Sequence, residues 1–316
     1  MRKNKQELIF GIEVKKNFIN ISCIEISNCG PCISFMRSVA ISPKTKEAGE
    51  VFDTHFLAES ISNVLIDFNY ENAKVVIGIY DLDFYKSIDK FSSKISKQDV
   101  LAKIGRKMHH ISKHKEQKYK PAFHLGSEEK KDNRLVFYGA IQELYANKIA
   151  ELADLLSFRL ADIEIVPLAI LRSIIWNNSH LSDNFLSMVI EDDYIDMNVV
   201  FNNQILLTRT IRLDLSKIID NEYLFNSVFQ KLEMFVLSFT DNYPRLEFPK
   251  KAVLFSRMEN NEKILGIFSE KLSSEYDCEI LKEPPFGSDR TDKGEILSSH
   301  DLTEGCAALG MALKPI

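Results

Sequence analysis

The sequence predicts an α/β protein of two lobes, with a small subdomain inserted into the first lobe. Three observations lead to this fold class. Between Ala153 and Leu213, helix-spaced apolar residues give way to a strand, a second helix and three strand-like runs, an order that joins two α/β halves. The chain has 316 residues, 45% of them hydrophobic, so it can bury more than one core. A segment near residues 81–134 carries a charge opposite to that of the remainder.

The first lobe, residues 1–180, should combine a sheet with helices in alternation. Apolar runs bounded by polar turns predict strands at Leu8–Val14, Phe18–Ser27, Cys32–Ser42, Lys74–Tyr80, Arg134–Ile141 and Asp162–Val166. Apolar residues at helical spacing predict helices at about 52–68, at Gln142–Arg159 and from Pro167 onward. Proline suits the first turn of a helix because its missing N–H has no partner to lose there.

The second lobe, residues 181–316, should open with a β-meander. Its three apolar runs lie near 185–190, 195–201 and 205–213. Further on, the periodicity predicts a helix at Glu222–Phe239, a strand at Lys251–Phe255, a helix at Glu262–Leu272, a strand at Asp277–Leu281 and a closing helix at 302–313. The polar stretch 284–299 has no regular pattern.

The inserted segment, about 81–134, is strongly basic. From Lys86 to Lys120 there are eleven Lys or Arg residues and three acidic ones, a local charge of about +8 against about −13 for the remainder. A helix near Lys97–Ser112 should carry four of these basic residues, with Arg106 and Lys107 on a basic face for an acidic partner or an anionic membrane surface. The pair His110 and His114 has the spacing of metal ligands, but no carboxylate or cysteine cluster accompanies it, and we expect no metal.

The sequence Cys29-Gly30-Pro31-Cys32 copies the spacing of a redox-active pair. A redox pair needs a helix after its first cysteine, because the helix dipole lowers the thiol pKa. Strand-like runs flank this pair on both sides, so we interpret 28–31 as a β-hairpin turn. No apolar run has the length of a membrane span and no secretory signal is recognisable, so we expect an intracellular protein. The net charge of −5 gives no indication of nucleic-acid binding.

Four short motifs occur in order along the chain: Gly11-Ile12-Glu13-Val14, Ile163-Glu164-Ile165-Val166-Pro167-Leu168-Ala169-Ile170, Leu207-Thr208-Arg209-Thr210-Ile211 and Ala307-Ala308-Leu309-Gly310-Met311-Ala312-Leu313-Lys314. Together they resemble the PilM family, the cytoplasmic actin-like proteins of bacterial type IV pilus assembly. The resemblance covers nearly the whole chain and implies a two-lobed actin-like (ribonuclease H-like) fold. The basic insert falls where that family has an extra small subdomain.

The actin-like fold binds ATP through three glycine-bearing turns, and this sequence departs from all three. The first turn reads Glu13-Val14-Lys15-Lys16-Asn17, the second Glu191-Asp192-Asp193 and the third Ser256-Arg257. Side chains in place of glycine obstruct the close backbone approach that phosphate binding requires. The second turn is also expected to set three carboxylates where phosphates would lie, and like charges repel.

Two functions from different classes follow from the resemblance. In the first, the protein is a scaffold at the inner face of the cytoplasmic membrane that is not an enzyme and has no cofactor. It would bind the N-terminal peptide of a PilN-like membrane protein, with pilus motor ATPases as further neighbours. Candidate residues for the peptide groove are Phe84, Tyr85 and Phe123. In the alternative, the protein still binds or hydrolyses ATP, with Glu13 and Asp193 near Mg²⁺. The lost glycines favour the scaffold.

Overall fold

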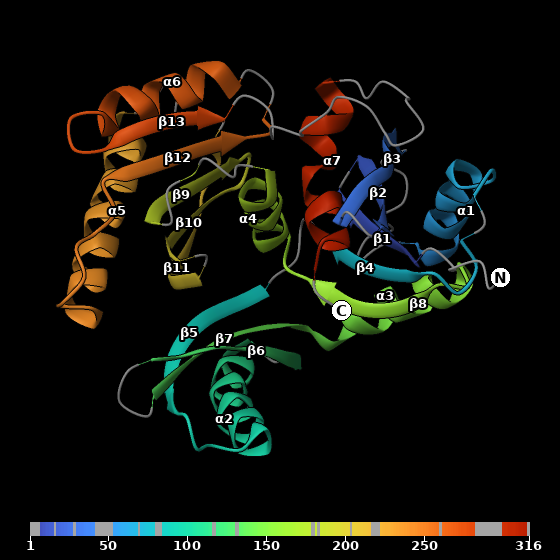
Figure 1. The fold of residues 1–316 in the computed structure, drawn as a ribbon, viewed down its shortest axis with the longest axis horizontal. Helices are drawn as coiled ribbons and strands as arrows, with labels where there is room; N and C mark the ends of the chain where they lie inside the picture. The colour runs from blue at the N-terminus through green and yellow to red at the C-terminus, as the bar shows by residue number, and fades with distance from the viewer. Residues whose placement is uncertain are drawn as a thin grey trace.

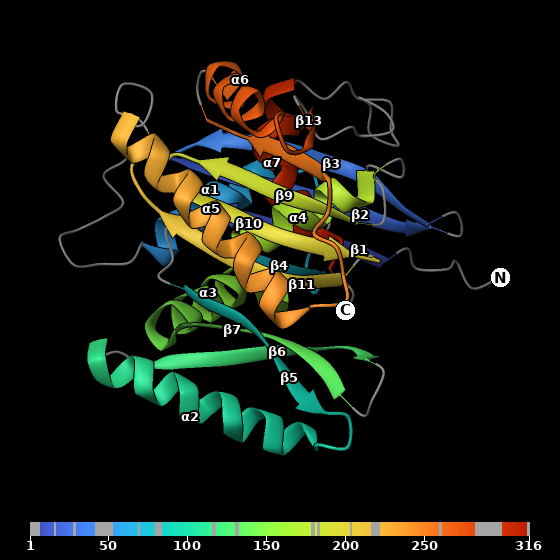
Figure 2. The same ribbon diagram turned by 90° about the vertical axis from the view of Figure 1, so that its left-hand side faces the viewer.

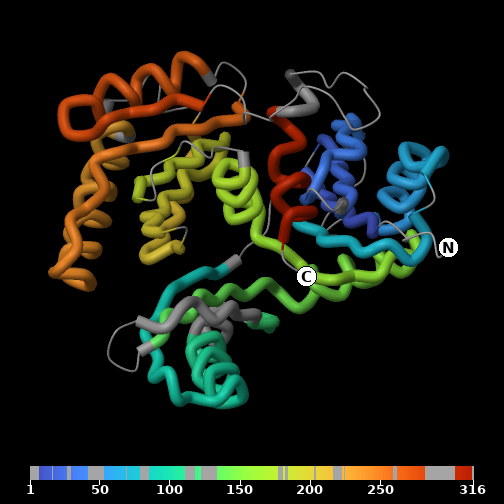
Figure 3. The backbone as a smooth tube through the Cα atoms, in the orientation of Figure 1, coloured from blue at the N-terminus to red at the C-terminus, as the bar shows by residue number. Residues whose placement is uncertain are grey.

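The computed structural model describes residues 7–15, 17–27, 30–41, 53–68, 70–79, 84–115, 118–129, 133–177, 181, 184–202, 204–215, 222–258, 261–281 and 299–314. Two five-stranded sheets stand side by side with two helices between them, and a third, smaller sheet lies beside both lobes (Figure 1). A tube through the backbone shows the same three bodies (Figure 3).

The first sheet has the order β3-β2-β1-β4-β8. Its strands are β1 (Glu7–Val14), β2 (Phe18–Ser27), β3 (Gly30–Ala40), β4 (Lys74–Ile79) and β8 (Arg159–Glu164). The first three strands pair antiparallel, whereas β4 is parallel to β1 and β8 is parallel to β4. Helices α1 (Thr54–Val64) and α3 (Glu143–Leu155) pack on one face through Leu57, Ile61, Ile149 and Leu152.

The second sheet repeats this topology in the order β11-β10-β9-β12-β13. Its strands are β9 (Asn184–Glu191), β10 (Tyr194–Phe201), β11 (Gln204–Arg212), β12 (Lys251–Ser256) and β13 (Asp277–Leu281). Helices α5 (Glu222–Asn242) and α6 (Asn261–Leu272) pack on its outer face through Val228, Phe235, Ile264 and Phe268. Two copies of one mixed sheet, each with helices on both faces, confirm the predicted two-lobed actin-like fold.

Helices α4 (Val166–Asn177) and α7 (Ser299–Ala312) form the layer between the sheets (Figure 1). Although α7 comes last in the sequence, it packs on the first sheet and against α4. The contact requires glycine at two positions, because a Cβ on Gly11 would lie 1.8 Å from the Ala308 carbonyl oxygen and one on Gly310 would lie 1.7 Å from that of Ala169. These close approaches give a physical reason for glycine in two of the four motifs.

The small subdomain contains β5 (Phe84–Ser92), α2 (Lys97–Lys115), β6 (Tyr119–Glu129) and β7 (Asn133–Gln142), with sheet order β5-β7-β6. Since β7 is the central strand, the small sheet extends beyond the expected boundary at residue 134. Helix α2 covers one face of this sheet through Val100, Ile104 and Met108 (Figure 2). The other face meets the second lobe, where Ile88 and Leu135 join its core and Lys86 forms a buried ion pair with Asp196 of β10.

The expected helix Gln142–Arg159 and strand Asp162–Val166 have wrong boundaries. The helix ends at Leu155 because Ser157 adopts φ 56°, outside the helical region, and the strand already begins at Arg159. The hairpin expected around 28–31 is confirmed, but its turn is shorter than expected, since Gly30 and Pro31 belong to β3 and pair with Ser27 and Ile26. Residues 28–29 lie outside the described residues, as does 284–298 of the irregular stretch. None of the helices in the described ranges is long and apolar enough to cross a membrane.

Candidate functional site

A cluster of charged side chains lies between the two lobes, where three strand ends meet. Glu13 comes from β1, Glu191 from the end of β9, and Arg257 follows β12. Arg257 donates from Nη1 and Nη2 to the two carboxylate oxygens of Glu13 at 2.7 and 3.0 Å, and from Nε to Glu191 at 2.7 Å. The side chains of Arg257 and Glu13 are 0% exposed and that of Glu191 is 2% exposed. One guanidinium therefore joins a carboxylate of each lobe without contact with water.

Arginine suits this position because its planar fork matches a carboxylate with two parallel hydrogen bonds. Burial raises the pKa of Glu13, but the charge and hydrogen bonds of Arg257 outweigh that effect and hold this pKa below its ordinary value. Glu191 receives a single bond from Arg257, and burial leaves its pKa raised. We therefore assign the permanent negative charge to Glu13 and expect Glu191 to take up a proton first.

A second ion pair extends the cluster toward α7. Lys15 donates to Glu304 at 2.7 Å, with side chains 15% and 12% exposed. Arg257 Nη1 also reaches the Glu304 backbone carbonyl at 3.2 Å, and Asn20 Nδ2 donates to Glu13 at 2.8 Å. Lys15, a residue of the first altered turn, is thus held by an acidic partner. We call Glu13, Lys15, Glu191, Arg257 and Glu304 the interlobe cluster.

The expectation of three carboxylates facing this position is wrong. Only Glu191 turns inward, because Asp192 and Asp193 form the two-residue turn between β9 and β10. Asp192 is exposed and Asp193 half-buried, and their backbone carbonyls accept from Leu215 and Leu213. The expected repulsion is also reduced, since Arg257 forms ion pairs with both Glu191 and Glu13.

The remaining predicted residues of the three turns are not part of the interlobe cluster. Ser256 is buried, and its Oγ accepts from the Met258 amide at 3.2 Å. Asn17 is exposed, and its carbonyl accepts from the Ile41 amide at 2.8 Å. Lys16 lies outside the described residues.

The interlobe cluster does not fit the phosphates and Mg²⁺ of a bound nucleotide. Both oxygens of Glu13 are engaged by Arg257, so this carboxylate has no open side toward a magnesium shell. The guanidinium in turn is already shared between two carboxylates. An incoming polyphosphate would have to break a buried bidentate pair, and such pairs are costly to disrupt.

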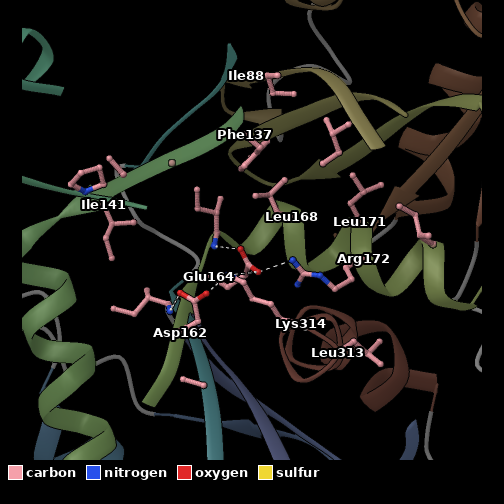
Figure 4. Close-up of a pocket in the computed structure, with 18 of the residues that line it drawn as sticks. Ile88, Phe137, Ile141, Asp162, Glu164, Leu168, Leu171, Arg172, Leu313 and Lys314 are labelled. Atoms are coloured by element: carbon pink, nitrogen blue, oxygen red, sulfur yellow. Dashed lines mark hydrogen bonds and ion pairs between the residues drawn. The ribbon is translucent and has the colours of Figure 1, made fainter. Parts of the chain in front are cut away.

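A second candidate site is a cavity of about 1060 Å³ beside the small subdomain. Its walls come from the face of the small sheet that lies opposite α2, from β8 and α4, and from the start of β11 (Figure 4). Most of the lining is apolar, including Ile88, Leu135, Phe137, Ile141, Leu168, Leu171, Ile175, Trp176, Ile205 and Leu313. We call this space the subdomain cavity. Its size and apolar lining are those of a ligand or peptide site.

The polar wall of the subdomain cavity is a closed ion network. Glu164 accepts from Arg172 at 2.8 Å and pairs with Lys314 at 3.2 Å, and Lys314 also pairs with Asp162 at 2.6 Å (Figure 4). Burial raises the pKa of Glu164, but Arg172, Lys314 and the Ile165 amide together hold it below the ordinary value. The two carboxylates and two cations of this network balance one another, and Lys120 on β6 is a further cation in the lining.

The sequence pointed to other residues for a groove. Tyr85 packs in the core of the small subdomain, with its ring 6.1 Å from that of Tyr138, and it does not line the subdomain cavity. Phe84 and Phe123 lie on β5 and β6, but their side chains are outside the described part of the structure. Phe137 and Ile141 instead project into the cavity from β7 (Figure 4). They belong to an apolar strand that the sequence identified without showing which face was covered.

The basic face lies on α2, away from the subdomain cavity. Arg106 is exposed, as are Lys97 and Lys103. Lys107 is an ion-pair partner of Asp89 on β5 and also contacts the Tyr138 hydroxyl at 3.4 Å. Arg106 therefore offers its charge to solvent, whereas Lys107 is partly engaged within the subdomain.

No protein-family model matches the chain, and no curated protein matches it. Among solved structures, the PilM–PilN type IV pilus biogenesis complex matches with a TM-score of 0.69 at 13% identity, covering 97% of this chain and 98% of the other. A protein of unknown function with an actin-like ATPase fold from Bacteroides thetaiotaomicron matches with a TM-score of 0.48 at 13% identity, covering 87% and 91%. At this identity the first likeness shows the fold.

Proposed function

We propose that this protein is a scaffold of a type IV pilus or related assembly platform, which binds an extended N-terminal peptide of a PilN-like membrane protein in the subdomain cavity. The observation that carries the proposal is the cavity itself, an apolar space of about 1060 Å³ between the small subdomain and the lobes. The likeness to the fold of a PilM–PilN complex supports a PilN-like partner. Peptides bind such sites through apolar pockets and backbone groups.

The scaffold works without hydrolysing ATP. The interlobe cluster supports this part of the proposal, because Arg257 supplies the bridge between the lobes that a nucleotide and its metal supply in an actin-like ATPase. Its partner would hold it at the inner face of the cytoplasmic membrane, with pilus motor ATPases as further neighbours. The basic face of α2 would add attraction to anionic lipid or to an acidic partner.

The small subdomain must be held in place for the cavity to keep its shape. Lys86 of β5 and Asp196 of β10 form an ion pair whose side chains are 3% and 0% exposed. Asp196 also accepts from Thr210 at 2.6 Å and from Asn198 at 2.8 Å. Lys90 lies over the Tyr243 ring, 4.3 Å from its centroid. These contacts fix β5 on the second lobe and so define one side of the binding site.

The chain's single tryptophan provides a direct test, because Trp176 lines the subdomain cavity. The probe is a synthetic peptide with the cytoplasmic N-terminal sequence of the PilN-like protein of the same organism. We expect saturable changes in tryptophan fluorescence with micromolar affinity, and at least tenfold weaker binding for Phe137→Ala. The matched control is Leu144→Ala, an apolar residue on α3 that is 55% exposed. Equal affinity for the wild-type protein and Phe137→Ala, or no fluorescence response, would contradict the proposal.

A further inference from the structure

Strand β8 borders the subdomain cavity with its backbone edge. It is the last strand of the first sheet and pairs with β4 alone within the described residues. Consecutive residues from Leu160 to Ile165 line the cavity. Successive side chains of a strand point to opposite faces of the sheet. If β8 faced the cavity with one face of the sheet, only every second residue would line it. Because every residue in turn does so, β8 presents to the cavity the backbone edge that does not pair with β4.

Two amides on this edge are directed away from β4. The Arg159 amide donates to the Ala73 carbonyl, so at the start of β8 the odd-numbered residues direct their amides toward β4. A register shift follows at Val75/Val76, and after it the even-numbered residues of β8 face β4 instead. Beyond the shift, the Ile163 amide donates to Asp162 Oδ1 at 2.8 Å and the Ile165 amide to Glu164 Oε1 at 3.1 Å. Each amide is thus bound by the carboxylate of the residue before it. Carboxylates of β8 itself therefore occupy the amides on the edge that faces away from β4.

These carboxylates do not depend on the amides for their stabilisation. Asp162 keeps Lys314 at 2.6 Å, and Glu164 keeps Arg172 at 2.8 Å and Lys314 at 3.2 Å (Figure 4). If the amides turned to another acceptor, no carboxylate would be left buried and unpaired, which is the costly outcome. Exchange of the acceptor on these two amides is therefore inexpensive.

We propose that the partner peptide adds to β8 as the next strand of the first sheet. Two of its carbonyls, two residues apart, would replace the carboxylates of Asp162 and Glu164 on the amides of Ile163 and Ile165. This inference rests on the proposed peptide-binding function and assigns its mode. Main-chain hydrogen bonds at a sheet edge supply affinity, and pockets for alternate side chains supply specificity.

The surroundings define the chemistry of the added segment. The carboxylates of Asp162 and Glu164 beside β8 are already paired with Arg172 and Lys314, so a cationic residue opposite this network would find no unpaired carboxylate there, and Lys120 on β6 adds a further cation to the lining. Apolar side chains surround the edge, with Phe137 and Ile141 on the small sheet and Leu168 on α4. The segment is therefore extended, free of cationic residues where it pairs with β8, and apolar on its alternate positions.

Backbone N-methylation of the synthetic PilN-like peptide tests this mode, because a methyl group removes the donor and obstructs pairing without changing the side chains. We expect binding to weaken at least tenfold at every second position of the paired segment, with little effect at the positions between. Binding of the unmodified peptide with no such alternation would overturn strand addition while leaving peptide binding intact. No binding of the unmodified peptide would overturn both.

The variant Asp162→Ala provides an independent readout, because it frees the Ile163 amide before the peptide arrives. We expect the peptide to bind at least threefold more tightly than to the wild-type protein. The matched control is Asp67→Ala, which removes an exposed carboxylate of the same lobe and should leave the affinity unchanged. Weaker binding to Asp162→Ala would show that this carboxylate contacts the peptide and does not compete with it, and would overturn the proposed exchange.

Discussion

Arg257 and Glu13 stand 244 positions apart in the chain and form a bidentate ion pair, with nitrogen–oxygen distances of 2.7 and 3.0 Å. The pair joins the residue that follows β12 of the second lobe to the first strand of the first lobe, and neither side chain is exposed. Glu191 adds a carboxylate from the second lobe on the same guanidinium. A contact made by the protein's own side chains thus joins the two lobes.

Removal of the guanidinium should strongly destabilise the protein. Arg257→Met leaves Glu13 and Glu191 buried without their cation, and loss of one partner of a buried pair costs about 3–5 kcal/mol. Urea unfolding followed by circular dichroism measures this change. The matched control is Lys251→Met on β12, whose partly exposed pair with Glu279 should cost no more than about 1 kcal/mol. Equal losses for the two variants would contradict the role assigned to Arg257.

Loosening the small subdomain should weaken peptide binding without altering the cavity lining. Lys86→Met removes the cation from Asp196, although Thr210 and Asn198 continue to bind that carboxylate. We expect faster amide hydrogen exchange in β5 and several-fold weaker peptide binding. Lys94→Met, an exposed lysine of the same subdomain, is the control. Unchanged exchange in β5 would show that Ile88 and Leu135 suffice to hold the subdomain.

Glu164 should make the free energy of unfolding decrease at acidic pH. Its folded-state pKa lies below the ordinary 4.5, so the folded chain holds this proton less tightly than the unfolded chain does. The stabilisation is complete above about pH 4.5 and is lost as the pH falls through the folded pKa. The difference in unfolding free energy between wild type and Glu164→Gln should therefore shrink on acidification. A difference that stays constant from pH 6 to pH 3 would contradict the assignment.

Charge reversal on α2 should affect association more than stability. Arg106→Glu alters an exposed charge and should weaken binding to vesicles that contain anionic lipid, with a shallower dependence on salt. Lys107→Glu is less informative because Lys107 is paired with Asp89, so its reversal also disturbs the subdomain. The control is Lys263→Glu, an exposed lysine on α6. Identical salt dependence for wild type and Arg106→Glu would remove the basic face as an interaction surface.

Local sequence patterns predicted the strands and helices of both lobes because apolar periodicity reflects which face of each element is buried. They could not predict that Arg257 meets Glu13, since a long-range ion pair leaves no periodic trace. They also could not select the cavity-facing side of β7, because Leu135, Val136, Phe137 and Tyr138 are apolar or aromatic on both faces. Each face of that strand is covered, one by α2 and the other by the lobes.

The lost glycines were an informative signal, but only in part. They indicated that the turns between the lobes are altered, and the side chains there form a cluster of ion pairs. The inward turn of Glu191 and the outward position of Asp192 follow from the two-residue turn that pairs Tyr194 with Glu191. A sequence shows three adjacent carboxylates, whereas the strand geometry decides which of them faces the interior.

The most direct test of the account is a calorimetric titration of the full chain with Mg²⁺-ATP, before and after saturation with the PilN-like peptide. Because Arg257 is bound by Glu13 and Glu191 and all three side chains are buried, we predict no heat beyond dilution in either case. Stoichiometric ATP binding, with a Kd tighter than about 100 µM or about −5.5 kcal/mol, would contradict the account. It would mean that the buried pair of Arg257 and Glu13 opens to admit a nucleotide.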